Sequence, residues 1–196
     1  MILLKDSKTK DNLMRAFAGE SQARNRYTFA ASQAKKENFA MIEHLFTYTA
    51  NQEKEHAEIF YNFLKELSGQ TIFVDGGYPV DIYPTTLELL KTSQHNEYEE
   101  WKVVYSDFSK IAKEEGFIKI SEVFDNIGKI EKIHGDRFGK FANYLETRKI
   151  FESFAEQSWI CLNCGNVHVG KTPPEICPVC NHPKGYYIRI EESPFE

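Results

Sequence analysis

Several features are scarce in this 196-residue sequence, and each absence excludes a class of function. No apolar run approaches the ~18 residues of a membrane-spanning helix, and the short apolar start of the chain stops at Lys5 and Asp6. The net charge of −5, with no cluster of lysine or arginine, gives no attraction to nucleic acid. No GxGxxG signature of a nucleotide site is present. We therefore expect a cytoplasmic protein with neither a membrane nor a nucleic-acid partner.

Cysteine is absent from the first 160 residues, and all four cysteines follow as Cys161, Cys164, Cys177 and Cys180. Two CxxC pairs that are 12 residues apart suit one tetrahedral metal ion in a reducing compartment better than they suit disulfides. Sulfur ligation of this kind fits zinc as well as iron. The uneven distribution indicates two modules: residues 1–148, and residues 159–196 after a linker over 149–158.

Proline is missing from four stretches that also contain little glycine, which predicts four helices. The third begins with a capping box, Thr85 and Glu88, and Asn38 is the expected cap of the second. Residues 69–84 are rich in glycine and proline and are expected to be extended. Sixteen extended residues span roughly 50 Å, the length of a 30-residue helix. The predicted fold is therefore mainly α, a ferritin-like four-helix bundle with one long crossover. The expected helices are 9–36, 38–68, 85–115 and a fourth that ends near 148.

An internal repeat relates the second helix to the fourth at an offset of 78 residues. Its spacing of 4, 3, 4, 3, 4, 3 keeps each set on one helix face. A Glu-x-x-His pair therefore lies midway along an apolar stripe in both helices. The first and third helices correspond at an offset of 77, through Leu13 with Leu90 and Glu20 with Glu97. The two sets are Ile42, Phe46, Thr49, Glu53, His56, Phe60, Phe63 and Ile120, Phe124, Ile127, Glu131, His134, Phe138, Phe141.

The carboxylates on these stripes predict a metal site. A single Glu-x-x-His pair is usually a solvated surface feature, but the stripe places these pairs in the core. Unpaired carboxylates cost several kcal/mol each when buried, and a pair of divalent ions removes that penalty. Two Glu-x-x-His helices plus one glutamate from each of two others is the ligand set of di-iron and di-manganese bundles. Glu100, three residues after Glu97, is a further carboxylate, because its counterpart in the first helix is Ala23.

With these motifs and the two CxxC pairs, the chain resembles rubrerythrin along its whole length. The resemblance implies that Glu53 and Glu131 bridge two irons, with Glu20 on the first and Glu97 and His134 on the second. It also implies that the first iron exchanges Glu100 for His56 on reduction. Tyr27 and Tyr105 lie where either could hydrogen-bond Glu100 or a bound peroxide, or simply pack.

The same resemblance implies a peroxidase of oxidative stress defence. Hydrogen peroxide would be reduced to water at the di-iron centre, and a one-iron, rubredoxin-like site would relay the electrons. Rubredoxin or a separate NAD(P)H-dependent reductase would be the donor, and a head-to-tail homodimer would bring the tail of one chain to the bundle of another. The tail resembles rubredoxin only in its two knuckles and flanking aromatics. Its small core is expected to contain Trp159, Ile160, Val167, Tyr186, Tyr187, Ile188 and Phe195. A ferritin-type iron oxidation or storage protein, or a redox sensor with a structural zinc tail, stays open.

Overall fold

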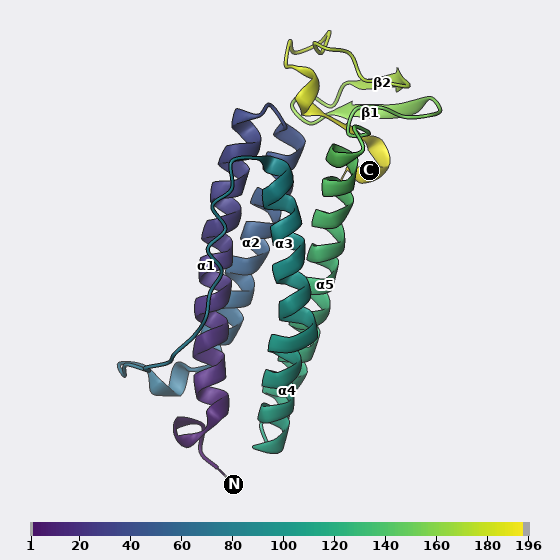
Figure 1. The fold of residues 1–196 in the computed structure, drawn as a ribbon. Coiled ribbons are helices and arrows are strands. Elements are labelled where there is room, and N and C mark those ends of the chain that lie inside the picture. Colours follow the sequence, from purple (N-terminus) through teal and green to yellow (C-terminus); the bar gives the residue numbers. More distant parts are fainter. Residues whose placement is uncertain (1, 194–196) are drawn as a thin grey trace.

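Four helical arms run side by side in the computed structural model, which describes residues 2–193, and a small β domain lies at one end (Figure 1). The first two arms form one antiparallel pair, and the third and fourth arms form another. The single-crossover bundle predicted from the sequence is thus confirmed. Within residues 2–193, no helix has both the length and the apolar character of a membrane span. The arms are α1 (Lys8–Lys36), α2 (Ala40–Phe63), α3 (Thr86–Glu99) continued through η3 (Glu100–Val104) into α4 (Tyr105–Glu114), and α5 (Ile118–Glu146).

The first turn of α1 is capped from two directions. Ser7 Oγ accepts a hydrogen bond from the Lys10 amide at 3.1 Å. The Glu115 carboxylate, just after α4, accepts from the Lys8 and Thr9 amides at 2.9 and 2.8 Å. Free N–H groups at a helix start carry a partial positive charge that favours an anion. Glu115 therefore joins the end of the third arm to the start of the first.

The predicted caps of the other helices have different outcomes. Thr85 caps α3 as expected, because its Oγ1 accepts from the Glu88 amide at 3.3 Å. The assignment of Asn38 as the cap of α2 is wrong, since Phe39 occupies the cap position and makes no side-chain hydrogen bond there. Asn38 instead has a φ of 63° in the tight turn between α1 and α2. Asparagine tolerates this left-handed conformation, which lets the chain reverse at once.

The crossover follows the length of α1 (Figure 1). After the short helix η2 (Lys65–Leu67), the chain has no helix or strand until α3. Three contacts, in chain order, fix it to positions that advance along α1. Asp81 also accepts a hydrogen bond from Asn96 at 2.7 Å, so it links α1 to α3. The contacts to α1 are Asp75 with Arg15 at 2.7 Å, Asp81 with Arg26 at 2.6 Å, and the Pro84 carbonyl with Gln33 at 2.8 Å.

The third arm contains a five-residue π-helix, η3, where the sequence predicts an uninterrupted helix. A π-helical turn accommodates one extra residue and is frequent at functional sites. The internal repeat shows that residue. Glu20 and Glu97 are 77 apart, whereas Tyr27 and Tyr105, which are both buried, are 78 apart. The insertion falls beside Glu100.

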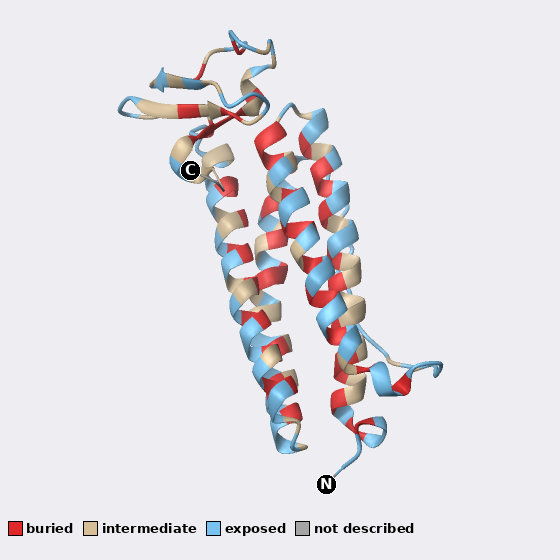
Figure 2. Ribbon diagram, turned by 180° about the vertical axis from the view of Figure 1, so that it is seen from behind, coloured by how far each residue is buried: buried red, intermediate tan, exposed pale blue. Residues whose placement is uncertain are grey.

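Two apolar layers fill the bundle, and Figure 2 shows the buried positions along the inner faces of the helices. One layer contains Phe46 and Phe138, and the other contains Phe60 and Phe124. In α2 and α5 the Glu-x-x-His pairs lie between these layers. The acidic groups are therefore enclosed from both ends of the bundle.

The small domain is a three-stranded antiparallel sheet of order β2-β1-β3. Its core holds Trp159 and Tyr187, which are fully buried, whereas Val167, expected in that core, is 49% exposed. Phe195, also expected there, lies outside the described residues. The strands are β1 (Gln157–Cys161), β2 (Val167–Gly170) and β3 (Tyr187–Arg189); the short helix η4 (Lys184–Tyr186) precedes β3, and η5 (Ile190–Glu192) follows it.

The small domain packs directly on the end of the bundle. Ile188 belongs to the same buried cluster as Phe138 in α5. Arg189 donates to the Lys149 and Glu152 carbonyls at 2.6 and 2.7 Å. The segment after α5 is thus held by buried contacts, which fixes the domain beyond the end of the helices (Figure 1).

Candidate metal centres

Six side chains meet in the middle of the bundle, and each is at least 94% buried. They form two groups whose ligand atoms lie within 4.8 Å of one another. Glu53 and Glu131 belong to both groups. The groups are Glu20, Glu53, His56 and Glu131, and Glu53, Glu97, Glu131 and His134.

The two shared carboxylates divide their oxygens between the groups. Glu53 places Oε2 3.0 Å from His56 Nδ1 and Oε1 3.0 Å from His134 Nδ1. Glu131 places Oε1 3.0 Å from His56 Nδ1 and Oε2 2.9 Å from His134 Nδ1. The arrangement has the approximate twofold symmetry of the sequence repeat, and it is the geometry that two carboxylates need to bridge two cations.

The cluster contains buried oxygen and nitrogen atoms that could bind metal ions. Among the described residues, both oxygens of Glu53 and Glu131, one of Glu20 and of Glu97, and Nδ1 of both histidines have no hydrogen-bond partner. Buried polar atoms are normally paired, because each unpaired one costs about 1–3 kcal/mol. Oxygen and imidazole donors suit iron or manganese. Two divalent cations would satisfy these atoms together.

The pKa values reflect the same excess of negative charge. Burial, together with neighbouring carboxylates, raises the pKa of Glu20 and Glu97. Burial opposes ionisation of Glu53 too, but the two histidines outweigh it and lower that pKa to about 2. Burial disfavours a charged His134, yet the surrounding carboxylates raise its pKa to about 12. The carboxylates thus draw a positive charge into the cluster, and a metal ion would replace the protons.

Glu20 and Glu97 each belong to only one ligand group, and each accepts a hydrogen bond from a tyrosine on the opposite helical arm. The Tyr27 hydroxyl donates to Glu97, and the Tyr105 hydroxyl donates to Glu20. Neither hydroxyl bonds Glu100, so of the roles left open for the two tyrosines, contact with a bound peroxide stays a prediction. Burial raises the pKa of both tyrosines, so each keeps its proton as a donor.

Glu100 lies beside the cluster and outside both ligand groups. Its position is the first residue of η3. Burial, then the charges of Glu97 and Glu20, raises its pKa well above the ordinary value. The structure therefore brings His56, and not Glu100, to the first group.

Two further residues near His134 were not predicted from the sequence. Gln52 Oε1 lies 3.1 Å from His134 Nε2, and Arg137 donates to the same Gln52 oxygen at 3.3 Å. A hydrogen bond on the outer nitrogen of a histidine leaves the inner nitrogen free to bind a metal. Arg137 follows His134 by three residues, so helical spacing was the available signal.

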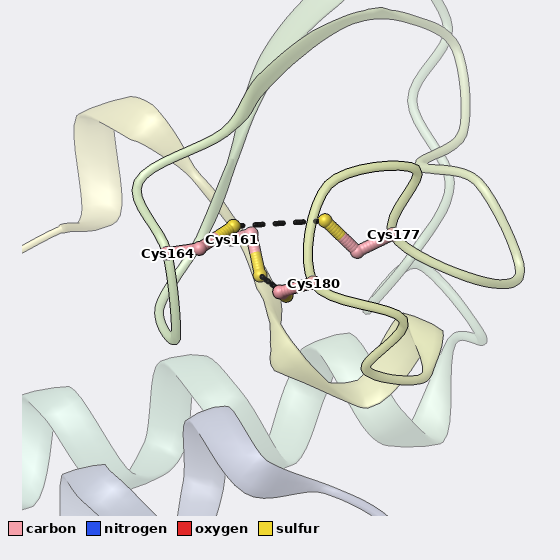
Figure 3. A group of neighbouring side chains, drawn as sticks. All are labelled: Cys161, Cys164, Cys177 and Cys180. Carbon is pink, nitrogen blue, oxygen red and sulfur yellow. Dashed lines mark hydrogen bonds between the residues drawn. The ribbon is translucent and has the colours of Figure 1, made fainter.

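The four cysteines gather at the tips of two loops in the small domain, and their sulfurs face one another (Figure 3). The Sγ atoms of Cys161 and Cys180, and those of Cys164 and Cys177, are 3.7 Å apart. Gly165, four residues after the first cysteine, has a φ of 74°, and Asn181, four after the third, has a φ of 59°. Both loops therefore turn through the same left-handed position, which glycine and asparagine accept best.

The thiols also fit a cation. Burial disfavours the Cys177 thiolate, but the Tyr187 hydroxyl and backbone amides stabilise it and lower its pKa to about 6. The Asn166 amide favours the Cys164 thiolate, but burial and the other thiols outweigh it and raise that pKa to about 12. Four thiolates cannot ionise together at this distance without a central positive charge.

Comparison with known proteins finds both sites together in one family. The family model described as rubrerythrin matches residues 11–142, and the model described as rubrerythrin, rubredoxin-like domain, matches residues 159–188. The chain belongs to the rubrerythrin family. The rubrerythrin of Porphyromonas gingivalis is 44% identical over 94% of this chain and 90% of its own length. The rubrerythrin of Clostridium perfringens is 41% identical over 97% of this chain and 98% of its own.

Solved structures support the rubrerythrin fold. A partially reduced nigerythrin covers 94% of this chain and 90% of its own, with 28% identity and a TM-score of 0.63. A bacterioferritin of Desulfovibrio desulfuricans has the same TM-score at 23% identity over 71% of this chain and 81% of its own, a likeness of fold alone. Rubrerythrin family membership makes this chain a di-iron oxidoreductase that also carries a rubredoxin-like four-cysteine site.

Proposed function

We propose that this rubrerythrin is a peroxidase of oxidative stress defence that reduces hydrogen peroxide to water. The overall reaction is H₂O₂ + 2e⁻ + 2H⁺ → 2H₂O, and the irons supply its two electrons when bound. The carboxylate and histidine cluster carries the proposal, because it is buried, its two groups share two carboxylates, and the additional carboxyl group of Glu100 lies beside it.

The proposed ligands follow from the two groups. Glu53 and Glu131 would be shared by the two irons, Glu20 and His56 would hold the first iron, and Glu97 and His134 would hold the second. The division of oxygens between His56 and His134 supports the bridging role. The four cysteines hold a single iron in the tail.

Glu100 is the proposed alternative to His56 on the first iron and a proton source for the reaction. Burial raises its pKa, which favours the protonated carboxyl group, and this group can give its proton to a leaving oxygen. Tyr27 and Tyr105 keep Glu97 and Glu20 in place and help to exclude water. The chain thus supplies ligand geometry, protons and a closed site.

Electrons would enter through the tail from rubredoxin or an NAD(P)H-dependent reductase. The small domain lies beyond the end of the bundle (Figure 1), whereas the acidic cluster lies between the two apolar layers of the bundle. This separation supports a head-to-tail homodimer in which the tail of one chain serves the bundle of the other. Grouped, unpaired thiols support a cytoplasmic location.

The decisive test is stopped-flow oxidation of the fully reduced protein by hydrogen peroxide and by dioxygen. We expect wild type to react much faster with peroxide. The Glu100→Ala variant should still bind two irons, since Glu100 belongs to neither ligand group. It should, however, lose most of the preference for peroxide over dioxygen. An unchanged peroxide rate in this variant would make Glu100 a spectator, and a wild type that prefers dioxygen would refute the peroxidase.

Iron oxidation and storage is the second candidate, because the bundle shares its fold with a bacterioferritin. Storage requires a closed shell of many subunits. Gel filtration distinguishes the two, since a dimer cannot enclose a mineral core.

A further inference from the structure

A surface pocket of about 570 Å³ lies between α1, the crossover and the π-helical turn. Its lining includes Glu100 and Tyr105. Tyr105 donates to Glu20, and the charges of the cluster act on Glu100. This pocket therefore joins the surface to the edge of the acidic cluster. The larger pocket, of about 770 Å³, lies between α2, α5 and the small domain, and no member of the cluster is among its lining residues.

Tyr78 of the crossover lines the smaller pocket and is 40% exposed. Its hydroxyl lies 3.3 Å from the Arg15 carbonyl of α1. The ring lies against two glycines: a Cβ on Gly19 would come within 3.8 Å of it, and a Cβ on Gly76 would come within 2.8 Å of its hydroxyl. Gly19 directly precedes Glu20, so the ring covers the turn of α1 that carries a ligand.

We propose that this pocket is the entrance for hydrogen peroxide, and that Tyr78 restricts it to small peroxides. The inference rests on the proposed function. Hydrogen peroxide is small and uncharged, so access depends on the space beside Tyr78 more than on the charges at the rim. The crossover thus has a second role besides connecting the helical pairs: it selects the substrate by size.

The first experiment opens the entrance. Tyr78→Ala removes the ring, and Gly76→Ala displaces it. Tyr83→Ala is the matched control, because Tyr83 is similarly exposed and does not line the pocket. The reduced proteins are mixed with hydrogen peroxide or tert-butyl hydroperoxide. We expect Tyr78→Ala to raise the rate with the bulky peroxide relative to hydrogen peroxide on the order of tenfold, Gly76→Ala less, and the control not at all.

The second experiment narrows the entrance and measures binding instead of turnover. Val103 lies on η3 in the pocket lining and is 52% exposed, and Val80, on the crossover, is 81% exposed and outside the lining. Val103→Trp should slow the association of azide with the oxidised centre several-fold, and Val80→Trp should not. Iron content and thermal stability confirm that each variant is folded and loaded.

The two proposals fail in different ways. If wild type reduces peroxide rapidly but Tyr78→Ala keeps its selectivity and Val103→Trp keeps its azide rate, peroxide enters elsewhere and the entrance is refuted. If wild type does not react with peroxide, the proposed function fails, while slower azide binding in Val103→Trp still identifies the entrance.

Discussion

The crossed hydrogen bonds of Tyr27 and Tyr105 allow the two metal positions to be weakened one at a time. Tyr105→Phe removes the donor to Glu20, which belongs to the group with His56. Tyr27→Phe removes the donor to Glu97, which belongs to the group with His134. Each substitution deletes one oxygen atom and keeps the buried ring.

The expected loss follows from the burial of these carboxylates, each of which is 1% exposed. A hydrogen bond to a buried charged group contributes about 1.5–3 kcal/mol. If that contribution is lost from metal binding, the affinity of one position falls roughly 10- to 150-fold. Partners of metal ligands typically affect affinity by about 10- to 100-fold, which agrees. The other position should change little, because its terminal carboxylate keeps its own tyrosine.

Anaerobic titration of the metal-free bundle with Co²⁺, followed by absorption and calorimetry, resolves the two positions. Each variant should show one weakened and one unaffected site, and the double variant should show both weakened. Tyr61→Phe is the control, since Tyr61 lies on α2 with 56% exposure and outside both groups. If each single variant weakened both sites equally, or neither, the assignment of one tyrosine to one metal would be refuted.

Three further predictions concern other parts of the molecule. Glu53→Ala should lose both irons and Glu20→Ala mainly one, which iron analysis per chain decides; two irons retained in Glu53→Ala would refute bridging. Glu115→Gln should cost about 1 kcal/mol, as helix caps do. Because contact with the Thr9 hydroxyl and the first amides of α1 lowers the pKa of Glu115 despite partial burial, this cost should be constant above about pH 5 and vanish as pH falls through the lowered pKa; denaturant midpoints against pH test it, and a cost that persists in acid would contradict it. The tail should hold one iron and give a red colour that a mild reductant bleaches; one zinc per chain in native-source material would exclude the electron relay.

The sequence was sufficient for the bundle and for most of the cluster, because both depend on periodicity. Residues at helical spacing share a face wherever the helix lies, so Glu53 with His56 and Glu131 with His134 had to meet once their apolar stripes packed together. The crossover could also be predicted from local sequence, because glycine and proline exclude a helix from residues 69–84. The sixteen residues of this segment set the distance that it can span. The four-cysteine site could be predicted from the spacing of the two CxxC pairs alone.

The direction in which a single side chain leaves its helix could be seen only in the tertiary structure. The π-helical turn at Glu100–Val104 shifts everything after it by one position, which sends Tyr105 to Glu20 and not to Glu100. The change of repeat offset from 77 to 78 was present in the sequence, but the turn that absorbs it was not located by periodicity.

The sequence by itself therefore determined which side chains share a face, and through them the fold and the chemistry of both sites. The tertiary structure decided which of these side chains touch. Whether His56 or Glu100 joins the first group, and whether Tyr78 covers the way in, depends on contacts between elements far apart in the chain. Such contacts are set by packing, since the close fit of neighbouring side chains has no counterpart in the local sequence pattern.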